Sequence, residues 1–351
     1  MTEACKPKIV IENLYKIFGS DPKSMVERVA AGMDKQQLLD EYNHVLGLRD
    51  INLSLNEHSI EVVMGLSGSG KSTLIRHINR LLEPTSGHVS IDGEDVLAYN
   101  KNQLRALRQH KVSMVFQRFA LLPHRNILEN VLFGLDVQGG ETAKHGEKAR
   151  YWLERVGLAG FEDNFPRQLS GGMQQRVGLA RALATDADIL LMDEAFSALD
   201  PLIRTEMQDM LLDLQSEFHK TIVFITHDLD EALRIGDRIA ILNDGSLVQQ
   251  GNAHDILVHP EDDYVQRFVA DVNRAKVLKA KSIMTKLNGA DPVPGDRPLT
   301  VGVGDSAEDV LNSVVLKNPS SIWVEDKAGD QVGYIKRADL AETIGRDNSL
   351  G

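Results

Sequence analysis

Residues 60–73 read Ile-Glu-Val-Val-Met-Gly-Leu-Ser-Gly-Ser-Gly-Lys-Ser-Thr, an apolar run followed by a glycine-rich segment. The run Ile60–Met64 is short and mostly apolar, which is typical of a buried strand, and Leu74 and Ile75 open a helical pattern. The spacing Gly-x-x-x-x-Gly-Lys-Ser in Gly65–Ser72 occurs in this strand–loop–helix context in proteins that bind phosphate. The stretch therefore predicts a phosphate-binding loop for a nucleoside triphosphate.

The residue types of this loop each have a physical reason. Glycines carry no side chain that would obstruct the backbone N–H groups as they turn toward the phosphates. The N-terminus of the following helix adds a partial positive charge. We expect Lys71 to neutralise the β- and γ-phosphates and the Ser72 hydroxyl to ligate Mg²⁺. The nucleotide-binding residues predicted here are Gly65, Ser67, Gly68, Ser69, Gly70, Lys71, Ser72 and Thr73.

A second apolar stretch, Ile189–Met192, is followed directly by Asp193 and Glu194. After a buried strand, Asp193 can hold Mg²⁺ through water, and Glu194 can orient or deprotonate an attacking water molecule. An apolar strand ending in Asp-Glu is common, but downstream of a phosphate loop it predicts the second half of a nucleotide-hydrolysing site.

The composition of the 351-residue chain is that of a globular protein, with 42% hydrophobic and 26% charged residues and a net charge of −12. No apolar run approaches the roughly 18 residues of a membrane-spanning helix, and residues 1–8 have no apolar core of a secretory signal. A single cysteine excludes an internal disulfide. We expect a cytoplasmic chain or a peripheral subunit, and the acidic balance argues against bulk nucleic-acid binding.

The order of the predicted elements indicates an α/β sheet covered by helices for residues 1–270. Within it, residues 21–46 show apolar residues at helical spacing around Gly32 and predict a helical insert. The predicted strands are Lys8–Ile11, Ile51–Leu55, Ile60–Met64, Ile189–Met192, Thr221–Thr226, Ile239–Leu242 and an edge strand at Val248–Gln250.

The C-terminal part of the chain has a different pattern. Residues 271–290 are rich in Lys and Arg and are expected to form a basic linker, and residues 291–351 predict a small α+β module. The elements expected in this module are a helix at Ala307–Leu316, strands at Ser321–Val324 and Gln331–Ile335, and a turn at Lys327–Asp330. The linker cations, which could rest on anionic lipid or simply be solvated, are Arg274, Lys276, Lys279, Lys281 and Lys286.

The segment Leu169-Ser-Gly-Gly-Met-Gln174 resembles the signature of the nucleotide-binding subunits of ABC transporters. Further motifs of that family occur in the order that is typical of it. Gln117, before the signature, matches the Q-loop; after the signature, Ser197–Asp200 matches the D-loop and Thr226–Asp228 contains the switch histidine. The resemblance covers roughly residues 8–270. It implies the P-loop α/β fold of an ABC cassette with a helical signature subdomain.

In that family two cassettes sandwich two ATP molecules, and each signature completes the partner's site. The resemblance therefore implies a homodimer in which Ser170, Gly171, Gly172, Gln174 and Asp200 serve the partner's nucleotide. Ser170 is of the type that caps a helix N-terminus, where exposed N–H groups attract anions.

The resemblance also implies the catalytic roles, the cofactors and the partners. Glu194, His227 and Gln117 would be catalytic, and Ser72, Gln117 and Asp193 would hold Mg²⁺ beside ATP. The partners would be permease subunits and an external substrate-binding protein, with the chain bound peripherally at the cytoplasmic face of the inner membrane. Residues Asn126–Leu132 are a candidate docking surface for the permease.

An aromatic residue upstream of the phosphate loop stacks on adenine in this family. Phe18 is the preferred candidate over Tyr15, although the insert at residues 21–46 interrupts the family spacing.

The sequence is most similar, within this family, to the ATPases of importers of quaternary amines such as glycine betaine, proline betaine and choline. The similar stretches are Met64–Arg76, Met192–Met207 and His227–Asp237. The C-terminal module resembles a single, degenerate CBS motif, with an entry at Lys279–Thr285 and a later strand–turn–strand at Ile322–Ile335.

Two alternatives remain open at this point. One is an importer ATPase for another small solute such as an amino acid. The other is an ABC ATPase outside transport, against which two features argue. The stretch between Ser72 and Leu169 is too short for the coiled coil of repair-type members, and the chain has one cassette where translation-type members have two.

Overall fold

The computed structural model describes residues 7–117, 120–139, 142–270, 272–287, 298–326 and 328–345. The chain divides into two compact units, Met1–Val248 and Gln249–Gly351. Over these described ranges, no helix has both the length and the apolar character needed to cross a bilayer.

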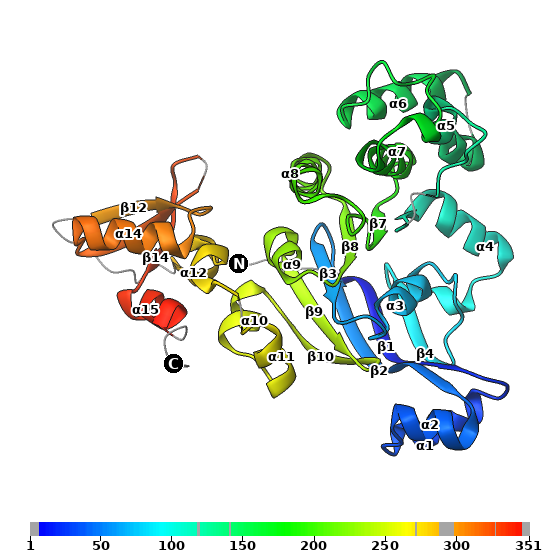
Figure 1. The fold of residues 1–351 in the computed structure, drawn as a ribbon, viewed down its shortest axis with the longest axis horizontal. Coiled ribbons are helices and arrows are strands. Elements are labelled where there is room, and N and C mark those ends of the chain that lie inside the picture. Colours follow the sequence, from blue (N-terminus) through cyan, green and yellow to red (C-terminus); the bar gives the residue numbers. More distant parts are fainter. Residues whose placement is uncertain are drawn as a thin grey trace. The chain divides into compact units, whose positions relative to one another are not determined.

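The N-terminal unit carries two sheets and their helices (Figure 1). Its strands are β1 (Pro7–Phe18), β2 (Val45–Asn56), β3 (Ile60–Met64), β4 (Ser86–Ile91), β5 (Glu94–Asp95), β6 (Val112–Val115), β7 (Ile189–Asp193), β8 (Thr221–Thr226), β9 (Arg238–Asn243) and β10 (Ser246–Gly251), in which the division between the units falls. Its helices are α1 (Val26–Ala30), α2 (Lys35–Tyr42), α3 (Lys71–Ile78), α4 (Lys101–Ala106), α5 (Ile127–Gln138), α6 (Thr142–Arg155), α7 (Gly171–Ala184), α8 (Pro201–Phe218) and α9 (Leu229–Ile235), with short helical turns η1 (Lys23–Met25), η2 (Val96–Ala98), η3 (Leu107–Lys111) and η4 (Pro166–Gln168).

The central sheet has the strand order β10-β9-β3-β8-β7-β6, and β9, β3, β8, β7 and β6 run parallel. β3 and β8 are buried along their whole length, as expected for parallel strands covered on both faces. Both were predicted with these same bounds, and the strands predicted at Ile189–Met192 and Ile239–Leu242 lie within β7 and β9. Because these strands are parallel, the residues after β3, β7 and β8 emerge at one edge of the sheet.

The second sheet, in the order β2-β1-β4-β5, is antiparallel and closes a core with the first. Ile9 of β1 and Leu55 of β2 belong to the same buried cluster as Val63 and Ile225 of the central sheet. β1 extends well beyond the predicted strand at residues 8–11. Left-handed backbone at Asn13 and shifts of register interrupt it, so the alternation of apolar residues ends before the strand does.

The helices predicted around Gly32 are present as α1 and α2, in the connection between β1 and β2 (Figure 1). Asp34 begins α2 with a capping box, since its carboxylate accepts the N–H of Gln37 at 2.8 Å and the Gln37 amide accepts the N–H of Asp34. The buried residues of the insert and of the adjoining strand ends form a small cluster of their own: Ile17, Met25, Val29, Leu38 and Leu46.

Helices α5, α6 and α7 pack against one another as a separate group, drawn in green in Figure 1. Asn126 caps α5, and Ser170 caps α7 by accepting the N–H of Met173. This group is the helical subdomain that the sequence predicted to carry the signature.

The C-terminal unit is a small α+β module, as predicted. Its sheet has the order β11-β14-β13-β12, in which β13 is parallel to β12 and antiparallel to β14. Its elements are α10 (Ala253–Val258), α11 (Asp263–Phe268), α12 (Arg274–Val277), α13 (Ala280–Ile283), β11 (Thr285–Lys286), β12 (Pro298–Gly302), α14 (Ala307–Lys317), β13 (Ser321–Glu325), β14 (Gln331–Ile335) and α15 (Arg337–Gly345). The predicted helix and both predicted strands of this module correspond to α14, β13 and β14. Of the predicted turn, Lys327 lies outside the described residues.

The structure corrects the prediction of a basic linker at 271–290. Residues 272–287 are folded into the C-terminal unit, because β11 pairs with β14 and Leu278 is fully buried. The N–H of Ala307 donates to the carbonyl of Leu278 at 2.8 Å. Residues 271 and 288–290 lie outside the described residues, as does the side chain of Lys276. The five cations do not form one free patch, since two guanidinium nitrogens of Arg274 are buried.

The division between the compact units also falls earlier than the predicted domain boundary at residue 270. Helix α10, which precedes residue 270, belongs to the second unit and packs against its α13. A boundary inside β10 could not be predicted from the sequence, because nothing in the short stretch Ser246–Gly251 marks a division between two compact units.

Candidate functional site

The phosphate loop leaves the C-terminal end of β3 and enters α3, and two of its glycines are required by close backbone approaches. Gly65 has φ +147°, and a Cβ atom there would lie 2.1 Å from the carbonyl oxygen of Leu242. Gly70 has φ +102°, and a Cβ atom there would lie 2.7 Å from the carbonyl oxygen of Gly47. The backbone of the loop therefore packs directly against β9 of the central sheet and β2 of the second sheet, at positions that only glycine can occupy.

Lys71, the first residue of α3, is turned back into the loop. Its Nζ donates to the carbonyl oxygens of Gly65 at 2.8 Å and Leu66 at 3.1 Å, and only 4% of the side chain is exposed. Burial lowers the pKa of Lys71, while the carboxylates of Glu194 and Asp193 oppose that change. The ammonium group thus lies where phosphate oxygens could replace the two carbonyls.

Ser72 and Asp193, two of the residues predicted to hold Mg²⁺, are in direct contact. The Ser72 hydroxyl donates to Oδ1 of Asp193 at 2.7 Å, and Arg76 donates to Oδ2 at 3.2 Å. A hydroxyl and one carboxylate are oxygen ligands of the kind Mg²⁺ prefers beside phosphates and water. No cluster of three or more acidic, His or Cys ligands occurs among the residues that the structure describes.

The other predicted catalytic residues, Gln117 and His227, lie close to the carboxylate of Glu194. Gln117 donates from Nε2 to Oε2 of Glu194 at 2.9 Å, and Nδ1 of His227 lies 3.7 Å from Oε1. Nζ of Lys71 is 3.8 Å from the same Oε1 atom. Glu194 itself has φ +46°, and its N–H donates to the carbonyl of Ile225. Residues that are far apart in the sequence therefore meet because β7 and β8 end at the same edge of the sheet.

A cavity of about 380 Å³ opens beside this group. Its walls come from the phosphate loop, from Glu194 and from the hairpin of β1 and β2: Phe18, Lys35, Val45, Leu46, Gly47, Ser67, Gly68, Gly70, Lys71, Ser72, Thr73 and Glu194. Phe18 lines this cavity and is 40% exposed, whereas Tyr15 packs against the buried cluster of the insert. Nζ of Lys16 lies 4.9 Å from the ring centroid of Phe18.

Four residues of this wall were not predicted from the sequence: Lys35, Val45, Leu46 and Gly47. The pairing of Phe18 with Val45 explains three of them, because the insert leaves β1 and re-enters at β2 directly opposite. A prediction of β2 that began at Val45 rather than Ile51 would have found them. Lys35 gives no such signal, since nothing in the helical pattern of the insert marks it.

The signature residues occupy a different place. Ser170, Asp200 and Gly171 are exposed at the starts of α7 and α8, and Gln174 donates to the carbonyl of Leu169 at 3.2 Å. A Cβ atom on Gly172 would lie 2.5 Å from Cγ2 of Ile203. Among the described residues that line the 380 Å³ cavity, none belongs to this group, so the chain does not bring its own signature to its own phosphate loop.

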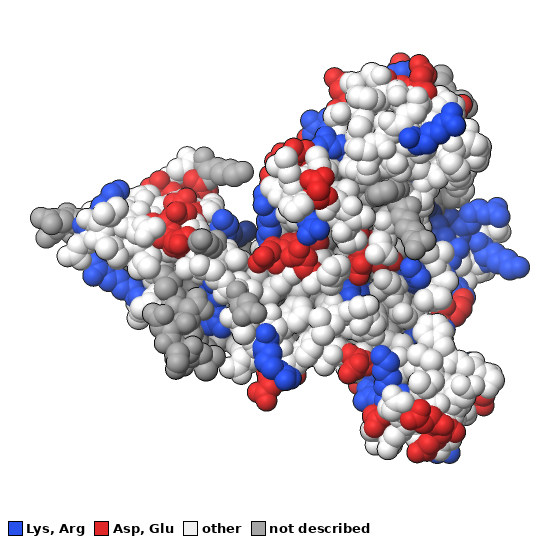
Figure 2. All heavy atoms as spheres, viewed as in Figure 1, with Lys and Arg blue, Asp and Glu red and all other residues white. Residues whose placement is uncertain are grey.

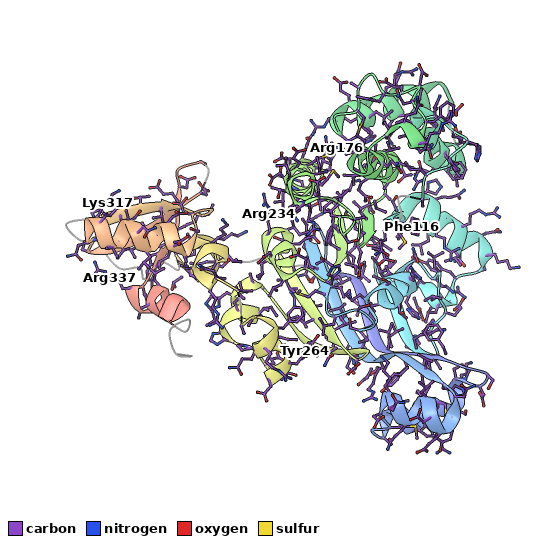
Figure 3. The ribbon with its side chains drawn as sticks, in the orientation of Figure 1. Phe116, Arg176, Arg234, Tyr264, Lys317 and Arg337 are labelled. Carbon is purple, nitrogen blue, oxygen red and sulfur yellow. The ribbon has the colours of Figure 1, made fainter. Side chains whose placement is uncertain are left out.

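Arginine side chains fix α7 and α9 to α8. Figure 3 labels Arg176 of α7, which donates to Glu206 at 2.8 Å, and Arg234 of α9, which donates to Asp209 at 2.7 Å. A third arginine, Arg204 of α8, pairs with Asp228 directly after His227. The signature helix and the switch histidine are thus both attached to the same long helix.

Comparison with known proteins decides the family. Residues 48–197 match the family described as ABC transporter. The glycine betaine transport ATP-binding protein OpuAA of Bacillus subtilis (strain 168) is 49% identical over 98% of this chain and 79% of its own length. The chain belongs to the ATP-binding subunits of ABC transporters. The family resemblance drawn from the signature and its accompanying motifs is therefore confirmed, and this ABC subunit is an ATPase.

Two further relatives differ in what their names state. The trimethylamine N-oxide transport system ATP-binding protein TmoW of Ruegeria pomeroyi (strain ATCC 700808 / DSM 15171 / DSS-3) is 47% identical over 94% of this ABC subunit and 95% of its own length. A solved dimeric structure of MJ0796, a bacterial ABC transporter cassette, is 32% identical and superposes with a TM-score of 0.59. That match covers 70% of this chain and 98% of the cassette, so the remaining part of this subunit lies outside the shared cassette fold.

Proposed function

We propose that this ABC subunit hydrolyses Mg²⁺-ATP to drive import of a quaternary ammonium solute, such as glycine betaine, proline betaine or choline, through separate permease subunits. The observation that carries the hydrolytic part is the position of Glu194, held by Gln117 and next to both Lys71 and His227. A carboxylate so placed at the mouth of a phosphate loop can accept a proton from a water molecule that attacks the γ-phosphate.

The roles of the other residues follow from their contacts. Lys71 exchanges its two loop carbonyls for β- and γ-phosphate oxygens, and His227 donates to the γ-phosphate and helps to hold the attacking water. Ser72 and Asp193, with Gln117, hold Mg²⁺, which when bound neutralises charge on the phosphates. Phe18 stacks on adenine with the face of its ring that Lys16 leaves free.

The working unit we propose is a homodimer in which each signature completes the partner's site. Two observations support it: Ser170, Gly171 and Asp200 are exposed, and they do not line the chain's own phosphate cavity. The N-terminus of α7, a helix of 14 residues, would present its N–H groups to the nucleotide of the partner subunit. Positioning and charge from both sides suit the loose transition state of phosphoryl transfer.

The permease is proposed to dock on an apolar groove beside α5. The predicted surface at Asn126–Leu132 is only partly available, because Ile127, Asn130 and Val131 are fully buried. A cavity of about 360 Å³ instead lies next to the exposed side chains of Phe133 and Val137 and includes Phe116, labelled in Figure 3. A permease helix seated there would lie one residue from Gln117, and the chain would sit at the cytoplasmic face of the inner membrane.

The proposed solute rests on the names of the relatives. Glycine betaine and trimethylamine N-oxide both carry a trimethylated nitrogen, and the two relatives named for them match most of this chain. The permease and an external binding protein would recognise that group, for example by cation–π contacts. An amino acid is the alternative solute.

The C-terminal module is proposed to be a regulatory, CBS-like half-module, supported by the β13–turn–β14 pair and α14.

The experiment that tests this function is uptake by proteoliposomes that contain the subunit with the permease and binding protein encoded beside it. We expect ATP-dependent uptake of radiolabelled glycine betaine, competed by trimethylammonium compounds and abolished by Glu194→Gln. Uptake of an amino acid with no competition by trimethylammonium compounds would establish the alternative solute.

A further inference from the structure

We infer that Lys35, the first residue of α2 in the helical insert, is a nucleotide-binding residue that contacts the triphosphate of ATP. The inference rests on the proposed binding of ATP in the 380 Å³ cavity, which Lys35 lines together with Phe18, Lys71 and Glu194. It assigns to the insert a part in the ATP site, whereas its helical pattern alone indicates only a structural element.

The insert is held firmly enough to place this side chain. Leu38 of α2 is fully buried in the cluster that it shares with Leu46, which lines the cavity, and with Ile17, which precedes the lining residue Phe18. Arg49 of β2 donates to the carbonyl of Met33 at 2.6 Å. Figure 1 shows α1 and α2 beside the β1–β2 hairpin. Because Asp34 also caps α2, the position of Lys35 is determined by contacts on both sides of it.

The charge of Lys35 suits a triphosphate. Of the described residues that line the cavity, Lys35 and Lys71 are the cations and Glu194 is the anion. Lys71 is buried in the loop, while the side chain of Lys35 is 43% exposed and free to turn toward a ligand. A bound triphosphate carries several negative charges into this space, and a second lysine at its open side would oppose that charge.

Asp244 is the alternative partner of Lys35. Its Oδ1 atom lies 3.8 Å from Nζ of Lys35, and it is 76% exposed in the turn between β9 and β10. A carboxylate and a phosphate would compete for the same ammonium group. Removal of the charge at Asp244 should therefore strengthen nucleotide binding, and removal of the charge at Lys35 should weaken it.

The test is the dissociation constant of a fluorescent ATP analogue for the full chain at low salt. We expect Lys35→Gln to weaken binding about two- to fivefold, the range of an exposed ion pair, and Asp244→Asn to strengthen it. Both effects should shrink as salt shortens the Debye length from about 10 Å at 0.1 M to 3 Å at 1 M. Adenosine, which has no phosphate, should compete equally well in all three proteins.

Lys23→Gln is the matched control, because Lys23 is an exposed cation of the same insert that does not line the cavity. It should leave the dissociation constant unchanged. Equal affinities of wild type and Lys35→Gln, with wild type still binding ATP, would overturn the role of Lys35 alone. Absence of ATP binding by wild type, or full binding by Lys71→Ala, would overturn the proposed ATP site itself.

Discussion

Gln117 donates a 2.9 Å hydrogen bond from Nε2 to Oε2 of Glu194, and this bond joins the end of β6 to the end of β7. The groove proposed for the permease begins at Phe116, directly before Gln117. A movement of the permease helix would therefore change the position of the carboxylate that we propose as the base. In the proposed mechanism, this bond would couple transport to hydrolysis.

The composite site is tested by a pair of complementary variants. Ser170→Arg should abolish hydrolysis but leave nucleotide binding at the phosphate loop intact, because in the proposed dimer Ser170 serves the partner's site. In a mixed dimer with Lys71→Ala, one site carries both changes and the other carries neither. ATPase assays over a series of mixing ratios should show partial recovery. No recovery at any ratio, with mixed dimers shown to form, would count against independent composite sites.

Asp193→Asn is expected to raise the Mg²⁺ concentration needed for hydrolysis by roughly 10- to 100-fold. This is the usual loss of metal affinity when a residue that contacts a metal's ligand or bound water is changed. The reason is that the amide still offers an oxygen to the Ser72 hydroxyl but lacks the negative charge that attracts Mg²⁺ and its bound water. A Mg²⁺ titration of the ATPase rate measures the change. Asp213→Asn, an exposed carboxylate on α8, is the control. The same Mg²⁺ requirement in both variants would remove Asp193 from the metal site.

Phe18→Ala should weaken ATP binding by about 1 kcal/mol, roughly fivefold, through loss of stacking on the base. Tyr15→Ala should leave affinity unchanged and lower the thermal midpoint instead, because Tyr15 packs against the buried cluster of the insert. Isothermal titration and thermal unfolding of both variants separate the two roles. If Tyr15→Ala weakens binding more than Phe18→Ala, the adenine contact belongs to Tyr15.

His77 of α3 should make the stability depend on pH. Its ring is fully buried, its Nδ1 contacts the carbonyl oxygen of Thr73 at 2.7 Å, and burial lowers its pKa to about 4 from the usual 6.5. Between these values the unfolded chain binds the proton more readily, so this contribution is present above pH 6.5 and is lost as pH falls to 4.

The size of the effect is up to about 3 kcal/mol. Chemical denaturation at pH 7 and pH 5 measures it, and His77→Gln should lose less stability than wild type over that interval. Parallel losses in the two proteins would show that other groups cause the acid sensitivity.

The sequence predicted the parallel strands and the phosphate loop closely, because both depend on local patterns. Ile60–Met64 and Thr221–Thr226 are short, mostly apolar runs, and their bounds agree with the structure. The long strand β1 was underestimated because Asn13 interrupts its alternation. Lys35 could not be found, since its place at the cavity depends on how the hairpin folds back. The linker at 271–290 was wrong because charge alone does not reveal that Leu278 is buried.

The most direct test of the account is the steady-state rate of ATP hydrolysis by Glu194→Gln at saturating Mg²⁺-ATP. The amide cannot accept the proton of the attacking water, so the rate should fall by about 10²- to 10⁴-fold while the dissociation constant for ATP stays near that of wild type. An ATP-stabilised dimer should then accumulate on size-exclusion chromatography. A rate close to that of wild type would contradict the assignment of Glu194 and, with it, the proposed mechanism.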